Sequence, residues 1–226
     1  MTTPVADLAR EVLAGDHVTA VLDYASVAVF ALAGALVASR SQLDVVGFIF
    51  IACLTAVGGG TLRDVILDRP VFWIDTPSML MVATVAAVLV FGTAHLLESR
   101  YRVLLWLDAL ALAVAVPAGV SAAYGMAVDW PVVLVAAMVT GCMGGLMRDV
   151  VCNEVPLVLK QGELYVTAAF AGAVVAVTLT ALGSGLQTVL IACGVATFVL
   201  RAGSLAFGWR LPVYKARPPR PDAPKR

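Results

Sequence analysis

Two short segments place glycines beside an arginine and an aspartate in otherwise apolar sequence. The first, at residues 58–64, reads GGGTLRD, and the second, at residues 144–149, reads GGLMRD. Charged side chains are costly to keep in apolar surroundings, and inside a membrane they mark ion or substrate pathways. The segments therefore predict a site that binds an ion and lets it pass through the membrane. In such a site, carboxylates and backbone carbonyls replace part of the ion's hydration shell.

The two arginines, Arg63 and Arg148, are 85 residues apart, and the surrounding sequence repeats at the same offset. Without any gap, this offset superposes Asp23 on Asp108, Gly34 on Gly119 and Asp44 on Asp129. Such self-similarity at a fixed period indicates an internal duplication. Repeats that enclose glycines and intramembrane charges are typical of transporters and channels, whose sites lie where the repeats meet.

The composition places the duplication in a membrane. Of 226 residues, 61% are hydrophobic and 13% are charged, which is not the balance of a water-soluble domain. The 4 cysteines form no CxxC pair and the 2 histidines stand apart from carboxylates. We therefore predict no metal site, no cofactor and no disulfide framework. Neither a nucleophile with its base nor a nucleic-acid motif is evident, so an enzyme or a nucleic-acid-binding protein is not expected.

Apolar stretches of suitable length predict an all-α integral membrane protein with seven transmembrane helices. The expected spans are 20–39, 45–62, 77–97, 103–122, 131–147, 163–182 and 186–207. Because each repeat holds three spans, an odd number, the second repeat must enter the membrane in the opposite sense. The prediction is two inverted three-helix repeats followed by a seventh helix.

This reading divides the chain into five parts. They are an N-terminal extracytoplasmic segment (1–19), the first repeat (20–97), the second repeat (103–182), the seventh helix (186–207) and a basic, proline-rich tail (208–226). Cytoplasmic loops carry the excess of Lys and Arg, so the basic tail predicts a cytoplasmic C-terminus. Seven crossings then put the N-terminus outside the inner membrane.

Glycines near the end of the second and fifth spans allow two interpretations. They are Gly58, Gly59 and Gly60 in the first repeat and Gly144 and Gly145 in the second. Small residues favour close packing of membrane helices, which is one interpretation. The other is a break in the helix that turns carbonyl oxygens toward a cavity. Three consecutive glycines followed by arginine and aspartate lead us to expect breaks at these positions, acting as hinges of an ion pathway.

The charged residues of the motif are expected to find partners elsewhere in the chain, because neighbours on a helix point about 100 degrees apart. The inverted symmetry suggests pairs across the two repeats. The candidates are Arg63 with Asp149 or Asp108, and Arg148 with Asp64 or Asp23. The alternative is that each pair extends to the lipid headgroups near the end of its span.

Two further aspartates, Asp23 and Asp108, lie about one turn inside the first and fourth spans. A carboxylate at that depth should face protein or water, where it could attract a cation or balance a motif arginine. A deep N-cap is the alternative. Asp44 and Asp129 are predicted to be N-caps of the second and fifth spans.

The doubled motif, the aspartates of spans one and four, and the inverted seven-span pattern resemble the prokaryotic members of the trimeric intracellular cation (TRIC) channel family. These overlap the bacterial UPF0126 membrane proteins, which are also grouped as glycine transporters. The resemblance covers residues 20–207. It implies a homotrimer, with a pore for monovalent cations such as K⁺ or Na⁺ in each protomer, lined by broken second and fifth helices. By resemblance, the motif glycines are the hinges and Arg63, Asp64, Arg148 and Asp149 lie near the pathway.

Two functions are therefore compared. The first is a potassium channel of the inner membrane, in contact with membrane lipids, without chemistry on the ion. The second is a secondary transporter of a small zwitterion such as glycine, whose two charged groups would bind helix ends.

Overall fold

The computed structural model describes residues 4–14, 16–97, 99–212 and 214. This part of the chain is helical, and its β-structure is limited to an isolated bridge between Glu163 and Arg210. The α-helices are α1 (Pro4–Ala14), α2 (Asp16–Arg40), α3 (Val45–Ile66), α4 (Phe72–Asp75), α5 (Ser78–Thr93), α6 (Arg100–Gly125), α7 (Trp130–Val151), α8 (Val166–Ala181) and α9 (Leu186–Phe207). Two short 3-10 helices, η1 (Ala94–Leu96) and η2 (Leu157–Leu159), complete the elements.

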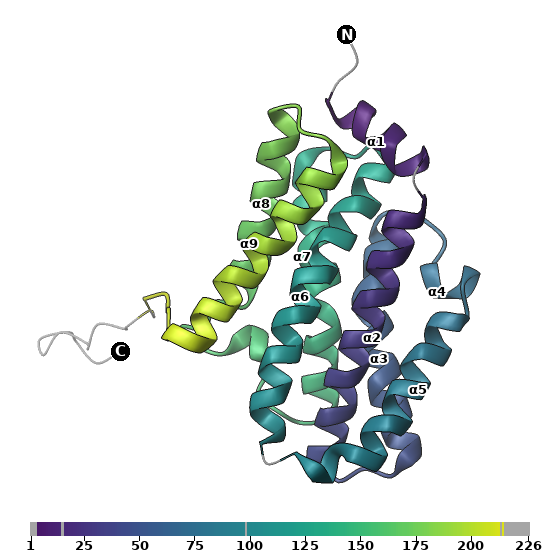
Figure 1. Ribbon diagram of the computed structural model, residues 1–226, viewed down its shortest axis with the longest axis vertical. Helices are drawn as coiled ribbons and strands as arrows, with labels where there is room; N and C mark the ends of the chain where they lie inside the picture. The colour runs from purple at the N-terminus through teal and green to yellow at the C-terminus, as the bar shows by residue number, and fades with distance from the viewer. Residues whose placement is uncertain (1–3, 15, 98, 213, 215–226) are drawn as a thin grey trace, which may run out of the picture.

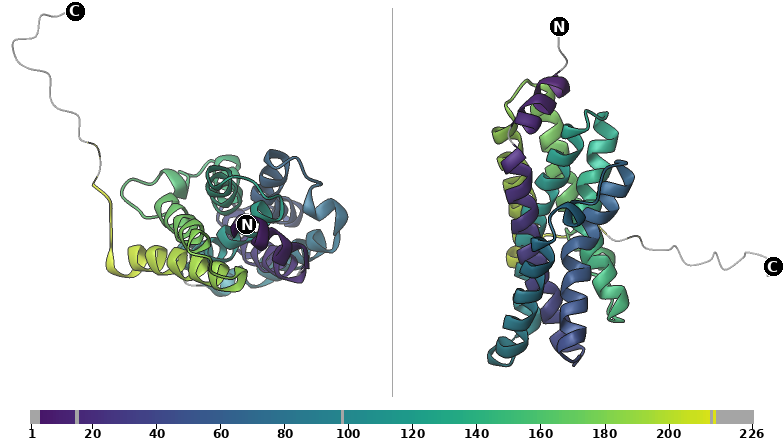
Figure 2. Two further views of the ribbon diagram at one scale, coloured as in Figure 1. Left: turned by 90° about the horizontal axis from the view of Figure 1, so that it is seen from above. Right: turned by 90° about the vertical axis from the view of Figure 1, so that its right-hand side faces the viewer.

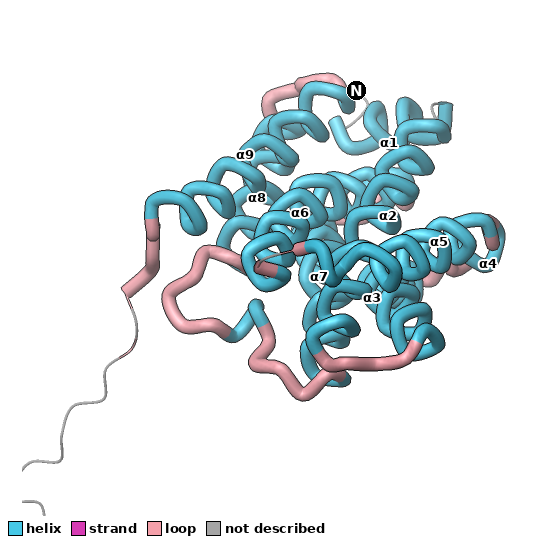
Figure 3. Tube along the Cα trace, turned by 60° about the horizontal axis from the view of Figure 1, so that its bottom comes forward, coloured by secondary structure: helices cyan, strands magenta, loops and turns pink. Residues whose placement is uncertain are grey.

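The long helices pack side by side along the long axis of the molecule, with α1 at the N-terminal end (Figure 1). Seen from above, α8 and α9 lie on one side of the bundle and α4 and α5 on the other (Figure 2). Most connections are short loops at the two ends, and a longer one links α7 to α8 through η2 (Figure 3). An apolar bundle of this kind can bury its backbone polar groups within each helix, as a membrane requires.

Six helices of the described chain are long and apolar enough to cross a membrane. They are formed by residues 18–40, 45–66, 78–96, 100–125, 130–151 and 186–207, and each contains most of one expected span. The remaining expected span, 163–182, corresponds to α8, an apolar helix of 16 residues. It begins three residues later than expected because Glu163 forms the bridge with Arg210 and residues 164 and 165 form a bend.

Elements related by the 85-residue offset run in opposite directions. In Figure 1, α2 descends while α6, its counterpart, ascends beside it. The turns also correspond: Asp68 after α3 and Asn153 after α7 both have positive φ, 51° and 54°. Asp and Asn tolerate this left-handed conformation better than most residues, which explains how both helices end in the same way.

Each half of the molecule has its own apolar core. One core consists mainly of side chains from α2, α3 and α5, and the other joins α6, α7, α8 and α9 with part of α1. Many of the core residues are alanines, so the helices approach closely. The cores meet where α3 packs against α7 and α2 against α6.

The N-terminal segment contains a helix that sequence reasoning did not predict. In α1, Leu8, Ala9 and Val12 are buried while Arg10 and Glu11 are exposed. This amphipathic pattern docks the helix on α6, and Glu11 accepts a hydrogen bond from the backbone N–H of Leu186 at 2.9 Å. Most of the predicted basic tail lies outside the described residues.

The two predicted N-caps have different outcomes. The Asp44 side chain accepts a hydrogen bond from the Gly47 N–H at 2.8 Å, so this cap is confirmed. Asp129 precedes α7 in an extended conformation, but its side chain makes no capping hydrogen bond. Pro131 removes one of the N–H groups that such a cap would satisfy.

Candidate functional site

The first cluster consists of Asp23 from α2 and Arg63 and Asp64 from α3. The Arg63 guanidinium donates through Nε to Asp64 Oδ1 at 2.8 Å and through Nη1 to Asp23 Oδ1 at 2.9 Å. Asp64 Oδ2 accepts from the backbone N–H of Phe72 at 2.8 Å, which ties the start of α4 to the cluster. Arg69 Nε lies 3.5 Å from Asp64 Oδ1 and adds a second positive charge.

The second cluster repeats this arrangement with Asp108 from α6 and Arg148 and Asp149 from α7. Arg148 Nε donates to Asp149 Oδ1 at 2.8 Å, while Nη1 and Nη2 donate to the two oxygens of Asp108 at 2.9 and 3.0 Å. Asp149 Oδ2 accepts from the Leu157 N–H at 2.9 Å. The residues of both clusters, including Phe72 and Leu157, are related by the offset of 85.

The predicted partners across the two repeats are therefore wrong. Arg63 pairs with Asp23 and Asp64, and Arg148 pairs with Asp108 and Asp149, each within one half of the chain. The argument from backbone direction failed because an arginine side chain is long enough to bend toward its neighbour. Extension to the headgroups is also excluded, since both arginine side chains are 0% exposed.

Asp23 and Asp108 are not N-caps, because both lie within continuous helices with their side chains on an arginine. Their alternative assignment, to balance a motif arginine, is confirmed. Burying these ion pairs costs hydration free energy, which their mutual attraction and their hydrogen bonds offset. Removing one partner would leave a charge buried without compensation.

The expected breaks at the glycines are not present. Helix α3 is continuous from Val45 to Ile66, and α7 is continuous from Trp130 to Val151. Neither glycine run interrupts the backbone hydrogen bonding, since the glycines lie at helix contacts, where a small residue is needed. The alternative interpretation, close packing, describes these positions correctly.

The closest contact joins the middle of α3 to the middle of α7. A Cβ on Gly59 would clash with the carbonyl oxygen of Thr140, and one on Gly144 would clash with that of Thr55. These four residues form two pairs related by the offset of 85. The threonines also match, since each hydroxyl donates to the carbonyl four residues earlier at 2.6 Å. The two helices thus cross in a self-complementary way between the two clusters.

One cavity adjoins the first cluster, and a second cavity lies at the related position in the other half of the chain. The first cavity, of about 380 Å³, is lined by Asp23 of the first cluster and by Arg69, Pro70 and Asp75, among others. The second cavity, of about 520 Å³, is lined by Arg40, Tyr101, Glu154, Val155 and Lys160. Residues 69, 70 and 75 of the first cavity are 85 positions before residues 154, 155 and 160 of the second. Equivalent cavities therefore lie at the two halves, but their charges differ.

Comparison with known proteins decides the family. Residues 20–95 and 105–181 match the family described as glycine transporter. Over 199 residues the chain is 35% identical to the UPF0126 inner membrane protein YadS of Escherichia coli, covering 85% of this chain and 94% of YadS. The chain belongs to the UPF0126 family. It is a multi-pass membrane protein, as the apolar helices indicate.

Solved structures connect this UPF0126 protein to the TRIC channels and confirm the resemblance. The TRIC channel orthologue from Rhodobacter sphaeroides is 39% identical and superposes with a TM-score of 0.81, covering 84% of this chain and 98% of that one. A second structure, from work on conductance through TRIC cation channels, is 28% identical and has a TM-score of 0.78. The match covers 88% of this chain and 98% of that one.

A third buried arginine of the UPF0126 chain was missed from the sequence. Arg201 in α9 is 0% exposed, donates to Glu163 at 3.0 Å and lies over the ring of Tyr165 at 5.1 Å. Its signal was a lone arginine in the second half of the expected span 186–207, which our search for repeated motifs passed over. Arg69 was also missed, since its role depends on a turn that returns it to Asp64.

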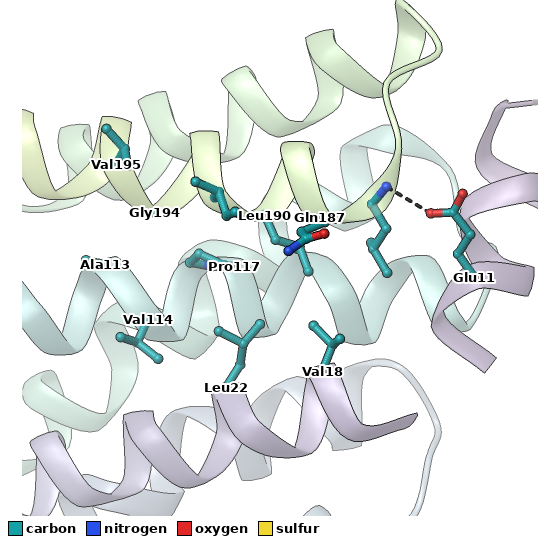
Figure 4. Close-up of a pocket in the computed structure, with 12 residues that line it drawn as sticks. Glu11, Val18, Leu22, Ala113, Val114, Pro117, Gln187, Leu190, Gly194 and Val195 are labelled. Atoms are coloured by element: carbon teal, nitrogen blue, oxygen red, sulfur yellow. Dashed lines mark hydrogen bonds between the residues drawn. The ribbon is translucent and has the colours of Figure 1, made fainter. Parts of the chain in front are cut away.

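A further groove of this UPF0126 protein is apolar, and no residue of either cluster lines it. It has a volume of about 670 Å³ and lies between α2, α6 and α9 (Figure 4). Valine, leucine and proline side chains form its walls, and Glu11 at one end is engaged with Leu186. In the part of the chain that the structure describes, no group of three His, Cys, Asp or Glu side chains could hold a metal ion.

Proposed function

We propose that the protein is a channel for monovalent cations, potassium among them, in the inner membrane. The observation that carries the proposal is the pair of buried clusters, each with two buried aspartates for one buried arginine. In the first cluster a partly exposed Arg69 adds a second positive charge at the rim, where a cavity adjoins it. An excess of carboxylate favours cations over anions. The names of the structural relatives, which are TRIC cation channels, support the same function.

The proposed pathway follows the contact between α3 and α7. It begins in one cavity, passes the first cluster, the crossing of Gly59 and Gly144, and the second cluster, and ends in the other cavity. Arg63 and Arg148 are fully buried and held by carboxylates, so the described conformation is closed along this line. Opening requires each arginine to move, which would leave the carboxylates to the passing cation.

The motif glycines have a defined part in this proposal. Gly58, Gly59 and Gly144 keep bulky side chains away from the contact between α3 and α7. Gly60 makes room for the ring of Phe72, and Gly145 for the hydroxyl of Tyr165. Because both helices are continuous at these glycines, the proposed motion is not a bend at a break but a shift of one whole helix against the other. Parting of α3 from α7 would open a path lined mainly by backbone and small side chains, where carbonyl oxygens can contact a cation.

The proposed topology is two inverted repeats with a seventh helix, an external N-terminus and a cytoplasmic C-terminus. Three observations support it: the opposite directions of α2 and α6, the two matched family segments that begin 85 residues apart, and the basic residues at one end. Arg40 and Lys160 both lie over the ring of Tyr101, and Arg100 donates to the Ser39 carbonyl. Such a basic end is typical of the cytoplasmic side.

A homotrimer with one pore in each protomer is part of the proposal. The support is the description of the Rhodobacter sphaeroides relative as a trimeric channel orthologue. The pathway along α3 and α7 lies within one chain, so each protomer would conduct by itself.

A second candidate function is a carrier for a small zwitterion such as glycine. The description of the matched family favours it. A carrier would use the same two clusters as alternating gates, one open at a time.

The test is the current across planar bilayers that contain the purified protein, under a potassium gradient. We expect unitary currents that reverse near the potassium potential and change when Asp64→Asn or Asp149→Asn is introduced. The matched control is Asp68→Asn, since Asp68 is exposed and its counterpart at position 153 is already asparagine. Size-exclusion chromatography excludes variants that do not fold.

Silent bilayers would overturn the channel proposal. Saturable uptake of glycine into proteoliposomes from the same preparation would then favour the carrier. If the protein gives neither a current nor glycine uptake, both candidate functions are excluded.

A further inference from the structure

Tyr165, which directly precedes α8, is a buried tyrosine with an unused hydroxyl. The residue is 2% exposed, and among the described residues its Oη has no hydrogen-bond partner. A second buried tyrosine, Tyr124, shares a hydrogen bond of 2.8 Å with the hydroxyl of Thr180. Because buried polar groups are nearly always hydrogen-bonded, the unused hydroxyl of Tyr165 indicates a partner that this conformation does not supply.

The hydroxyl of Tyr165 lies beside the second cluster. A Cβ on Gly145 would lie 3.1 Å from Tyr165 Oη and 3.6 Å from Arg148 Nη2. The two groups therefore flank the position of a side chain that Gly145 lacks. A guanidinium N–H can donate to a hydroxyl oxygen, so Tyr165 offers Arg148 an acceptor besides its two aspartates.

Arg148 can change its partners without leaving the cluster. Its Nε donates to Asp149 Oδ1 at 2.8 Å, while Nη1 and Nη2 donate to Asp108 at 2.9 and 3.0 Å. If the Nη groups turn from Asp108 toward Tyr165, the bond from Nε to Asp149 can stay. The arginine would then keep a carboxylate partner, and the carboxylate of Asp108 would become free.

Arg201 of α9 holds the ring of Tyr165 in place. Its guanidinium carbon lies 5.1 Å from the centroid of the ring, and Nη1 donates to Glu163 Oε2 at 3.0 Å. A cation over an aromatic face is attracted to it, more strongly where water is excluded. The Leu164 N–H also donates to the Ser204 hydroxyl at 3.2 Å, which fastens this segment to α9. Helix α9 thus sets the position of the Tyr165 hydroxyl.

We propose that Tyr165 is the acceptor that receives Arg148 when the second cluster opens. Arg148 exchanges its hydrogen bonds to Asp108 for one to Tyr165 Oη, keeps its bond to Asp149, and leaves Asp108 to the passing cation. Arg201 is the positioning residue for this exchange. The inference rests on the proposed channel function, and it names the group that holds the displaced arginine in the open state.

The first cluster has no equivalent acceptor. The residue 85 positions before Tyr165 is Leu80, whose side chain cannot accept a hydrogen bond. The counterpart of Gly145 is Gly60, which faces the ring of Phe72, and Arg63 lies over that ring at 5.3 Å. The exchange is therefore assigned to the second cluster alone.

The test is single-channel recording of Tyr165→Phe, as the full chain in planar bilayers under a potassium gradient. We expect the open probability to fall about tenfold, since the variant removes a hydrogen bond to a charged group in the open state. The unfolding temperature in detergent should not fall, because the hydroxyl has no partner in the closed conformation of the described chain.

The matched control is Tyr124→Phe, which removes a hydroxyl that already has a partner. This variant should lower the unfolding temperature and leave the open probability unchanged. The opposite pattern in the two variants separates a role in opening from a role in stability.

Gly145→Ala tests the exchange from the side of α7. Its methyl group would stand between Tyr165 Oη and Arg148 Nη2, so it should also lower the open probability. Gly92→Ala is its control, because nothing lies within 4 Å of a Cβ at that position.

An open probability of Tyr165→Phe equal to that of the wild type would overturn the inference, whatever happens to the unfolding temperature. In that case the wild-type currents would still support the channel, and only the exchange would be removed. Silent wild-type bilayers would remove the channel proposal and the exchange with it.

Discussion

The first and second clusters have the same residues but hold them differently. In the second cluster Arg148 binds both oxygens of Asp108, whereas in the first Arg63 binds one oxygen of Asp23. The first cluster instead has Arg69 beside Asp64, and the second has Glu154 at the equivalent position. The first therefore has two arginines for two aspartates and a partly free carboxylate, while the second has one arginine with its bonds complete.

In the proposed pathway, this difference would give the two halves separate tasks. A bidentate pair is geometrically defined and costly to open, whereas a single hydrogen bond beside a polar cavity can exchange with water or a ligand. We expect the first cluster to open more readily than the second.

The largest predicted effect is the loss of the second arginine. Arg148→Gln leaves Asp108 and Asp149 buried without a cation, and breaking such a buried pair costs about 3–5 kcal/mol. Arg63→Gln should cost less, because Arg69 remains beside Asp64 and Asp23 lines a cavity. Thermal unfolding of the detergent-solubilised variants measures both. Equal losses of stability would contradict the difference between the clusters.

The next effect concerns the crossing, where the two halves are alike. Gly59→Val and Gly144→Val should each destabilise the fold by about 1–3 kcal/mol, since either side chain meets a threonine carbonyl. Gly92→Val is the control, because nothing lies within 4 Å of a Cβ at that position. A large difference between the first two variants in the same unfolding assay would show that the crossing is not symmetric.

A smaller effect separates the two helix starts. Asp44→Ala removes a capping hydrogen bond of 2.8 Å and should cost about 1 kcal/mol. Asp129→Ala removes no such bond, so its unfolding temperature should stay close to that of the wild type. Equivalent losses for the two variants would mean that Asp129 caps its helix in solution.

The smallest effect should come from the half-exposed rim charges. Arg69→Gln removes one positive charge from the first cluster and should change the open probability of the channel by about a few-fold, as expected for a pair worth up to about 1 kcal/mol. Glu154→Gln, on the other side, should leave it nearly unchanged because Glu154 contacts Arg40 and not the cluster. Single-channel recording compares them, and a stronger effect of Glu154→Gln would contradict the expectation that the first cluster opens more readily.

Much of the fold could be predicted because it depends on local sequence. Long apolar segments determine where helices can span a membrane, and the expected ranges match the observed helices within a few residues. The short α8 and the amphipathic α1 were harder, since one is shorter than a typical span and the other has a modest apolar face. The duplication also identified the central arginine and the two aspartates of each cluster in advance, but not Arg69.

The pairing within the clusters could not be predicted in the same way. A repeat relates residue 63 to residue 148, but it does not say whether Arg63 contacts its own half or the other. That choice depends on where α2 lies against α3, which only the packed structure shows. The glycines were misjudged for a related reason, because the same residue permits a broken helix and a close contact.

The crossing of α3 and α7 also bears on how the molecule was assembled. Each glycine faces the carbonyl of a threonine from the other helix, and the two contacts are equivalent. Such an isologous contact is what two identical subunits form around a two-fold axis. Under the proposed duplication, the chain carries the equivalent of a dimer interface inside a single polypeptide, and its halves differ in charge at Arg69 and Glu154 while the fit between α3 and α7 is kept.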